Sequence, residues 1–297
     1  ARAHHAVKKA RVALIGPRQT WRVAGPQDST LEEWDFAKKF GASIVHIEME
    51  ELIGAAEAQS ESAALEALNV IRKDRLGKCL ADDERLLWYT KVYLGIKQLA
   101  SRYGLTAVAA ECYPNYIGLT NVPASWLADE GFVVETEGDI GHATMMLALN
   151  EMAPGITALA EAGGYDVASN GLYLAHGGSS AHSLAGDVST AYIPKTGKFV
   201  GLKYKPTPVV TLASIRGGNG AYRLSVTTGS IEEANQAEWE DAGYRLVAKF
   251  RPRIAVEDFF DGLLDAGTDH HVLIHEGDLT RQLAIFCDLF GVEKVDL

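Results

Sequence analysis

The stretch FVVETEGDI, residues 132–140, joins a run typical of a buried strand, 132–134, to one typical of a helix, 140–150. Carboxylates that follow a strand in an α/β sheet line the crevice where ligands bind. Glu135, Glu137 and Asp139 alternate, so they crowd one face if the strand continues, which is costly unless a cation or a shared proton relieves the repulsion. The stretch therefore predicts an α/β sheet with a metal or an acid/base site at its edge. The alternative is a solvated loop in which Asp139 caps the next helix.

The first half of the chain alternates strand and helix signals, which is the pattern of a parallel sheet with crossover helices. A capping box, 29–32, predicts a helix that ends at Gly41, and Pro123 is expected at the N1 position of another helix that ends at Gly131. A long amphipathic helix is expected from about Asp82 to Tyr103. Strands are predicted at residues 11–16, 43–47, 107–110 and 132–134.

The pattern changes at residues 150–155, where Pro154-Gly155 interrupts it. From there, short strands separated by Gly, Pro and Asn turns predict an antiparallel β structure, and a last helix is expected at 279–290. The predicted fold is α/β, with a doubly wound parallel-sheet domain at 1–154 and a β-rich C-terminal domain at 155–297. The strands of the second half are predicted at residues 171–175, 199–204, 209–215, 221–227, 244–250 and 271–275.

Composition narrows the class of protein. The chain has 297 residues, of which 47% are hydrophobic, enough for two domains with full cores. A net charge of −11 argues against nucleic-acid and anionic-membrane partners and favours a small neutral or cationic ligand. Three scattered cysteines indicate a reducing compartment, by default the cytoplasm. Because the chain enters a strand at Arg11 with no initiator Met before it, we expect a further segment to precede it.

Four positions are candidates for chemistry. Glu161 is a lone carboxylate in an apolar stretch, where burial needs a partner, either a metal or an arginine. His176 ends a predicted strand beside two glycines, and the pair 270–271 opens the last strand, where only one ring can face a given site. The alternatives are a strand-end histidine bonded to a carbonyl and a surface histidine pair. With Glu137 these residues form an oxygen and nitrogen ligand set without thiolate, which suits Mn²⁺, Mg²⁺ or Co²⁺.

Other motifs are missing from the sequence. The turn after the first strand does not match GxGxxG, so nicotinamide binding has little support, and no GxxxxGK[ST] phosphate loop is present. No serine lies in a GxSxG elbow, which argues against hydrolase chemistry of that kind.

Five segments together resemble the superfamily of L-fucose isomerase and L-arabinose isomerase, in matching order and strand and helix context. The likeness extends from about Val12 to the end of the chain. The segments are AVAAECYP at 107–114, VPA to LADEG at 122–131, TEGD to TM at 136–145, NGL to HGG at 170–178, and HH to EGD at 270–278 with FGVE at 290–293.

The resemblance implies a doubly wound domain followed by a β-rich domain, and Mn²⁺-dependent interconversion of an aldose and a ketose. By this match, Glu137, Glu161 and one histidine of the pair, His271 in preference to His270, hold the ion, and His176 is a further ligand. The same two glutamates are the expected acid/base pair, moving a proton through an enediol. Side chains expected to contact substrate or ligands are Asp139, His270 and Glu111.

The sequence also departs from the family. Thr136 and Gly177 occupy positions where members have Cys, although neither change removes a ligand. Family chains have a further α/β domain before the strand that begins here at Arg11, which fits the expected missing segment. The resemblance implies a homo-oligomer. The alternative functions are a sugar-binding relative without turnover and a Mn-dependent lyase or epimerase on the same scaffold.

Overall fold

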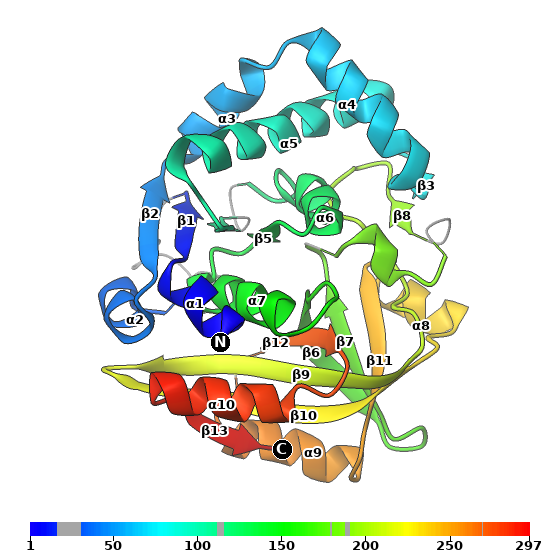
Figure 1. Cartoon of the computed structure of the whole chain (residues 1–297). Coiled ribbons are helices and arrows are strands. Elements are labelled where there is room, and N and C mark those ends of the chain that lie inside the picture. Colours follow the sequence, from blue (N-terminus) through cyan, green and yellow to red (C-terminus); the bar gives the residue numbers. More distant parts are fainter. Residues whose placement is uncertain (17–30, 112–115, 179, 188–190, 269) are drawn as a thin grey trace.

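The computed structural model describes residues 1–16, 31–111, 116–178, 180–187, 191–268 and 270–297. It is a mixed α/β structure built on two main sheets, which we call the parallel sheet and the mixed sheet. Figure 1 shows the parallel sheet in the upper part and the mixed sheet in the lower part, with helix α7 between them. Expected features at residues 29 and 30, the start of the predicted capping box, lie outside the described residues.

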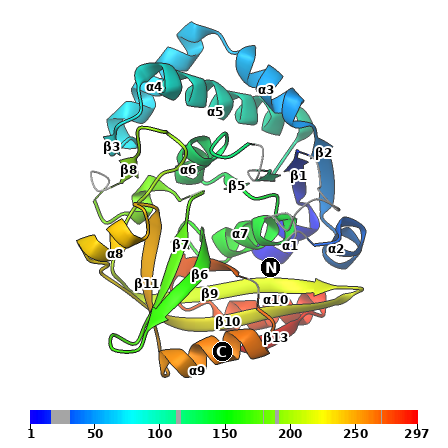
Figure 2. The ribbon, with the colours of Figure 1, turned by 180° about the vertical axis from the view of Figure 1, so that it is seen from behind.

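The parallel sheet has the order β2-β1-β4-β5, and all three of its pairings are parallel. Successive strand residues enter opposite cores: Val12 and Leu14 pack with α1, α2 and α7, whereas Ala13 and Ile15 pack with α3, α5 and α6. Helices thus cover both faces of this sheet (Figures 1 and 2). Its strands are β1 (Arg11–Ile15), β2 (Ser43–Ile47), β4 (Ala107–Ala110) and β5 (Val133–Glu135).

The helices around the parallel sheet end where the sequence predicts. Gly41 and Gly104 adopt the left-handed conformation that a glycine tolerates, and they terminate α2 and α5. The expectation for Pro123 was wrong, because α6 begins at Asn121 and the proline is its third residue. Its missing N–H is still harmless in the first turn. The bounds are α1 (Arg2–Lys8), α2 (Glu33–Phe40), α3 (Met49–Glu57), α4 (Glu61–Asp74), α5 (Asp83–Tyr103), α6 (Asn121–Asp129) and α7 (Ile140–Met152).

The mixed sheet comes entirely from the second half of the chain, in the order β11-β7-β6-β12-β9-β10-β13. The prediction of an antiparallel structure holds for every pairing but one, since β10 and β13 are parallel. A predicted strand at 199–204 was wrong: this segment makes only isolated bridges, at Gly201, Lys203 and Tyr204. The strands are β6 (Ala158–Asp166), β7 (Gly171–His176), β9 (Thr207–Gly218), β10 (Ala221–Glu232), β11 (Leu246–Pro252), β12 (His271–Glu276) and β13 (Glu293–Asp296).

Smaller elements complete the second half. The last helix, α10 (Thr280–Phe290), ends at Gly291 as expected and packs against β10 and β13. Three short helices and a small two-stranded sheet, which pairs β3 of the first half with β8, were not predicted. Their bounds are β3 (Lys78–Cys79), η2 (His182–Leu184), β8 (Tyr192–Ile193), α8 (Gln236–Asp241) and α9 (Val256–Asp265).

Helix α7 connects the two sheets. It is buried on nearly all sides and contacts β1, β4 and β5 of the parallel sheet as well as β9 and β12 of the mixed sheet. One hydrophobic core therefore includes Leu14 of the parallel sheet together with Leu273 and Ala213 of the mixed sheet. The division at residues 154 and 155 stays a prediction.

Candidate functional site

The loop between β5 and α7 is organised by Glu135, the last residue of the strand. Its buried carboxylate accepts hydrogen bonds from the backbone N–H of Glu137, at 2.7 Å, and of Asp139, at 2.6 Å. Gly138, with φ of 76°, provides the left-handed residue that this tight turn requires. The strand therefore does not continue through the acidic run. Instead, the backbone turns around the carboxylate of Glu135, and the carboxylates of Glu137 and Asp139 contact His271 of the mixed sheet.

Asp139 caps the next helix, as one interpretation of the sequence expected, but it is buried rather than solvated and also contacts two histidines. One carboxylate oxygen accepts the backbone N–H of His142 at 2.9 Å, which makes Asp139 the N-cap of α7. The other oxygen lies 2.7 Å from Nδ1 of His142 and 3.1 Å from Nδ1 of His271. All three side chains are buried. The start of α7 is thereby joined to strand β12.

Four of the sequence-predicted residues converge on one point. Ligand atoms of Glu137, Glu161, His176 and His271 all lie within 4.8 Å of one another. Oε2 of Glu137 is 3.1 Å from Nε2 of His271, and Oε1 is 3.3 Å from Nε2 of His176. Donors that share one cation at bond lengths of about 2.1 Å lie about 3 Å apart when they are at right angles. These separations are thus compatible with a bound ion.

The sheet itself aligns two of these groups. Glu161 of β6 is directly opposite His271 of β12 in the antiparallel register, so their side chains project from the same face as a cross-strand pair. His176 is the last residue of β7, the next strand, whose Ala175 pairs with Glu161. Glu137 approaches from the loop after β5. Residues 137, 161, 176 and 271 therefore meet because three adjacent strands end or pair beneath the start of α7.

The carboxyl groups and imidazoles of the site shift one another's pKa values. Burial would lower the pKa of His271, but hydrogen bonds to the carboxylates of Asp139 and Glu137 outweigh burial and raise its pKa to about 11. Burial would likewise raise the pKa of Glu137, yet the imidazoles of His176 and His271 hold it well below its usual range. For Glu135, burial and the charge of Asp139 raise the pKa well above normal. Without an ion, His271 therefore keeps a proton that a metal would have to displace.

His271 is oriented for metal binding. Its Nδ1 lies against Asp139, an acceptor, so the Nδ1 proton is fixed there and Nε2 faces Glu137. A carboxylate that holds the far nitrogen of a histidine ligand is the usual outer partner in metal sites. Glu161 adds a second favourable feature: among the described residues its carboxylate has no hydrogen bond or ion pair. The donor set fits a divalent cation, for which Glu137, Glu161 and His271 are the best placed ligands.

His176 is oriented differently. Its Nδ1 accepts the backbone N–H of Gly178 at 2.8 Å, so in the neutral ring the proton is on Nε2. That Nε2 is buried and, within the described ranges, has no aligned hydrogen-bond partner. As the ring lies here, His176 is better suited to donate a hydrogen bond into the site than to ligate an ion.

In the part of the chain that the structure describes, a second group that could hold an ion consists of Asp139, His142 and His271. The remaining predicted residues, His270 and Glu111, lie outside both groups. His270 is exposed, and its ring centroid is 4.4 Å from that of His271. Of the two adjacent histidines it is thus His271 that enters the cluster. Glu111 is fully buried after β4 and packs closely against Gly16. Their expected contacts with a substrate stay predictions.

Sequence reasoning missed three residues of the site. Glu135 was recognised only as part of an acidic run, and its role in holding the loop depends on the turn after it. His142 and Ser214 were not considered at all, although His142 stands three residues after the predicted N-cap Asp139, a spacing that brings it back to the cap. Ser214, in the middle of β9, has no sequence signal.

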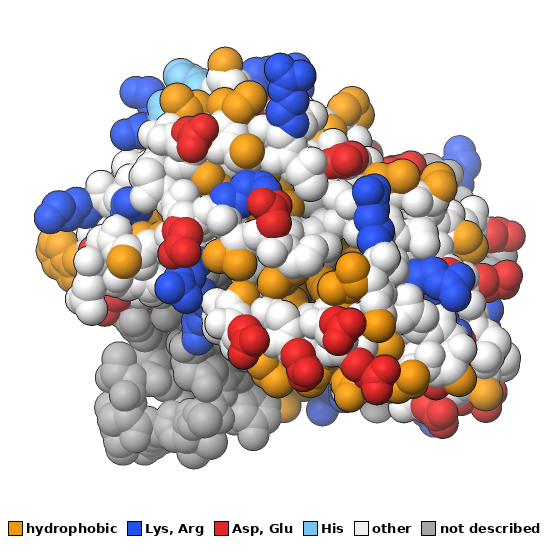
Figure 3. All heavy atoms as spheres, turned by 90° about the horizontal axis from the view of Figure 1, so that it is seen from below, with side chains coloured by type: hydrophobic (Ala, Val, Ile, Leu, Met, Phe, Trp, Pro, Cys, Tyr) orange, Lys and Arg blue, Asp and Glu red, His pale blue; other side chains and the backbone are white. Residues whose placement is uncertain are grey.

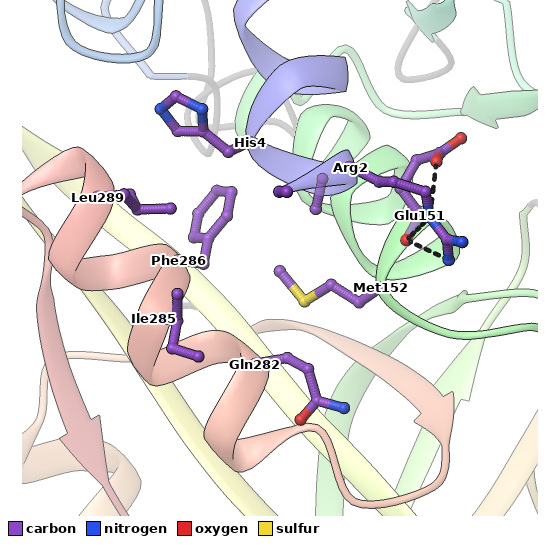
Figure 4. Close-up of a pocket in the computed structure, with 10 residues that line it drawn as sticks. Arg2, His4, Glu151, Met152, Gln282, Ile285, Phe286 and Leu289 are labelled. Atoms are coloured by element: carbon purple, nitrogen blue, oxygen red, sulfur yellow. Dashed lines mark hydrogen bonds and ion pairs between the residues drawn. The ribbon is translucent and has the colours of Figure 1, made fainter.

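A separate pocket of about 300 Å³ opens between α1, the end of α7 and α10 (Figure 4). Met152, Ile285 and Phe286 line it, and at one edge the guanidinium of Arg2 donates to the backbone oxygen of Glu151. None of the four clustered ligand residues contributes to this pocket. On the face shown in Figure 3, acidic, basic and hydrophobic side chains are intermixed.

Comparisons with known proteins add no relative: neither a scan against protein-family models nor a search of curated proteins finds a match. In the described part of the chain, each helix is too short or too polar to cross a membrane.

Proposed function

We propose that this chain is a metal-dependent aldose–ketose isomerase that binds Mn²⁺ through Glu137, Glu161 and His271, with Mg²⁺ or Co²⁺ as alternatives. The observation that supports it most directly is the convergence of two carboxylates and two imidazoles from three strands and a loop at one point. The sequence resemblance anticipated the same four residues. Oxygen and nitrogen donors without thiolate favour these ions over structural zinc.

A divalent cation bound here would polarise the carbonyl of an open-chain sugar and make the hydrogen on the adjacent carbon more acidic. The carboxylate of Glu161 is half-buried and has no hydrogen-bond partner among the described residues, so it is available to accept the C2 proton. Glu137 is a weaker base, because two imidazoles stabilise its ionised form. Return of the carbon-bound proton to C1, with transfer of the O2 proton to O1, converts the aldose through an enediol to the ketose.

The test is a panel of aldopentoses and aldohexoses incubated with Mn²⁺-loaded protein in D₂O. Isomerisation is expected to produce a ketose and to exchange the C2 hydrogen of the aldose, both visible by NMR. Glu161→Gln should reduce the rate at least about 1,000-fold, consistent with loss of a positioned base and of a metal ligand. The isosteric control Glu66→Gln, on the exposed face of α4, should leave the rate unchanged.

The products distinguish the alternatives. An epimer or a dehydrated product in place of a ketose would favour an epimerase or a lyase. Sugar binding without any product or exchange, by a protein that retains Mn²⁺, would favour a binding protein. Either result would contradict the isomerase proposal.

A further inference from the structure

A continuous chain of hydrogen bonds leads from the ring of His271 into the interior and back to its own backbone. Asp139 Oδ2 lies 3.1 Å from Nδ1 of His271 and 2.7 Å from Nδ1 of His142. Nε2 of His142 lies 3.2 Å from Oγ of Ser214, and that hydroxyl donates to the backbone oxygen of His271 at 2.7 Å. The two ends of this chain therefore hold one residue, His271.

All four side chains in this series of hydrogen bonds are shielded from solvent. His142 is 1% exposed and Ser214 is 3% exposed, while Asp139 and His271 are fully buried. An unpaired polar group in such surroundings is destabilising. Each group here has a partner, so the arrangement of all four side chains is mutually determined. These hydrogen bonds also link three elements, since His142 belongs to α7, Ser214 to β9 and His271 to β12.

The directions of donation follow from the acceptors. A backbone oxygen can only accept, so the hydroxyl proton of Ser214 points to His271. Nε2 of His142 lies at hydrogen-bond distance from the same hydroxyl, and its role there depends on the tautomer of the ring. The carboxylate of Asp139 accepts on the other side of the same ring. His142 thus fixes the position of the carboxylate that in turn fixes the proton on Nδ1 of His271. The consequence is that Nε2 of His271 is directed to Glu137.

We propose that His142 and Ser214 are positioning residues of the metal centre, which act through Asp139 and through the backbone of His271 to hold the Nε2 lone pair toward the ion. This inference rests on the metal centre of the proposed function. Outer partners of this kind change metal affinity about 10–100-fold when they are removed. Neither residue reaches the cluster of ligand atoms around Glu137 itself, so neither is a ligand of that ion.

The test is calorimetric titration of chelator-treated protein with Mn²⁺, with no sugar present. Two nearly isosteric substitutions form a matched pair: His142→Asn offers an amide N–H to Asp139 in the place of Nδ1, whereas His142→Leu offers none. We expect the affinity of the Asn variant to remain within about fivefold of the unmodified protein, and that of the Leu variant to fall about 10–100-fold.

A second pair of variants tests the proposal even if His142→Leu does not fold. Ser214→Ala loses the hydrogen bond to the backbone oxygen of His271 and should weaken Mn²⁺ binding about tenfold. Ser225→Ala, on the neighbouring strand β10, removes another buried hydroxyl, which bonds to Thr268, and should leave the affinity unchanged. Circular dichroism and thermal melts establish that each variant is folded.

Equal affinities for Ser214→Ala and Ser225→Ala would overturn the inference. So would equal affinities for folded His142→Leu and His142→Asn. The test is independent of turnover, because a protein that binds Mn²⁺ but isomerises no sugar contradicts the proposed function and leaves this comparison intact. An unmodified protein that binds no Mn²⁺, Mg²⁺ or Co²⁺ would overturn both.

Discussion

The ring of His271 has a different partner on each of its two nitrogens, and this determines what it can do. Asp139 holds Nδ1 and Glu137 faces Nε2, whereas the ring of the adjacent His270 is exposed. These two residues are both histidines and are adjacent in sequence, so a comparison of their variants isolates the effect of burial in the site.

We expect His271→Gln to lower the affinity for Mn²⁺ at least about 100-fold, because a ligand with a fixed tautomer is lost. His270→Gln should change the affinity less than about threefold. Calorimetric titration of both variants measures this. Equal losses would show that the cluster does not bind the ion.

His176 is expected to behave as a hydrogen-bond donor. Because Gly178 donates to its Nδ1, His176→Gln should weaken Mn²⁺ binding less than about tenfold, well short of the effect of His271→Gln. The same titration decides the point. A loss as large as that of His271→Gln would make His176 a ligand, as the family resemblance implies, and would require its Nδ1 to give up the bond from Gly178.

Individual site residues were predictable only where a motif identified them. Glu137 and Asp139 are conspicuous because they follow a strand. Glu161, His176 and the pair at 270–271 were candidates from their places in apolar stretches and at strand ends, and the resemblance joined them into one ligand set. The spacings along the chain are too long to link these residues without it. Lone polar residues within apolar runs, such as His142 and Ser214, become recognisable only when α7 lies against β9 and β12.

At the scale of elements, the end of strand β7 is unusually sensitive to added volume. A Cβ at Gly178 would come within 2.2 Å of Oγ1 of Thr136 and 2.5 Å of the ring of His176, closer than any real contact. At the adjacent Gly177 the nearest atom would be 3.7 Å away, in Arg245. The two glycines are adjacent in sequence, yet their tolerance for a methyl group is opposite.

Gly178→Ala should therefore lower the free energy of unfolding by about 1–3 kcal/mol, the usual cost of overpacking, and should also weaken Mn²⁺ binding as the ring of His176 is displaced. Gly177→Ala should be nearly neutral in both respects. Urea denaturation and titration measure the two effects. If both variants are equally stable, this contact does not constrain the site.

The elements themselves divide into those with strong and those with weak local signals. The runs 12–15 and 107–110 are continuously apolar, and the helix at 83–103 has clear periodicity and a capping aspartate, so these elements were predicted. Strand β6 was missed because its sequence, ALAEAGGYD, is rich in Ala and Gly, which favour strands poorly. It forms because β7 and β12 pair with it on both sides.

For the whole molecule, the site couples metal binding to stability and to pH. The pKa of His271 in the metal-free protein, about 11, is raised above the value of about 6.5 in an unfolded chain. Its contribution to stability is therefore complete below about pH 6.5 and declines as the pH rises toward 11. The ion requires the deprotonated ring, so its affinity changes in the opposite direction.

We expect the increase in melting temperature on adding Mn²⁺ to grow from pH 6.5 to pH 8.5, as affinity rises up to about tenfold per pH unit. Differential scanning calorimetry with and without chelator gives this increment at each pH. His271→Gln should abolish both the increment and its pH dependence. An increment of constant size across this range would mean that no proton leaves on binding.

The pairing of Glu161 with His271 has a further implication for how the protein reaches its native state. In a β ladder, a slip of one residue turns every side chain of the strand to the opposite face. A chain with β6 and β12 misaligned would bury the neighbours of these residues and leave no place for the ion. Divalent cations in the refolding buffer should thus act as a selective ligand for the correctly registered sheet and increase the yield of native protein.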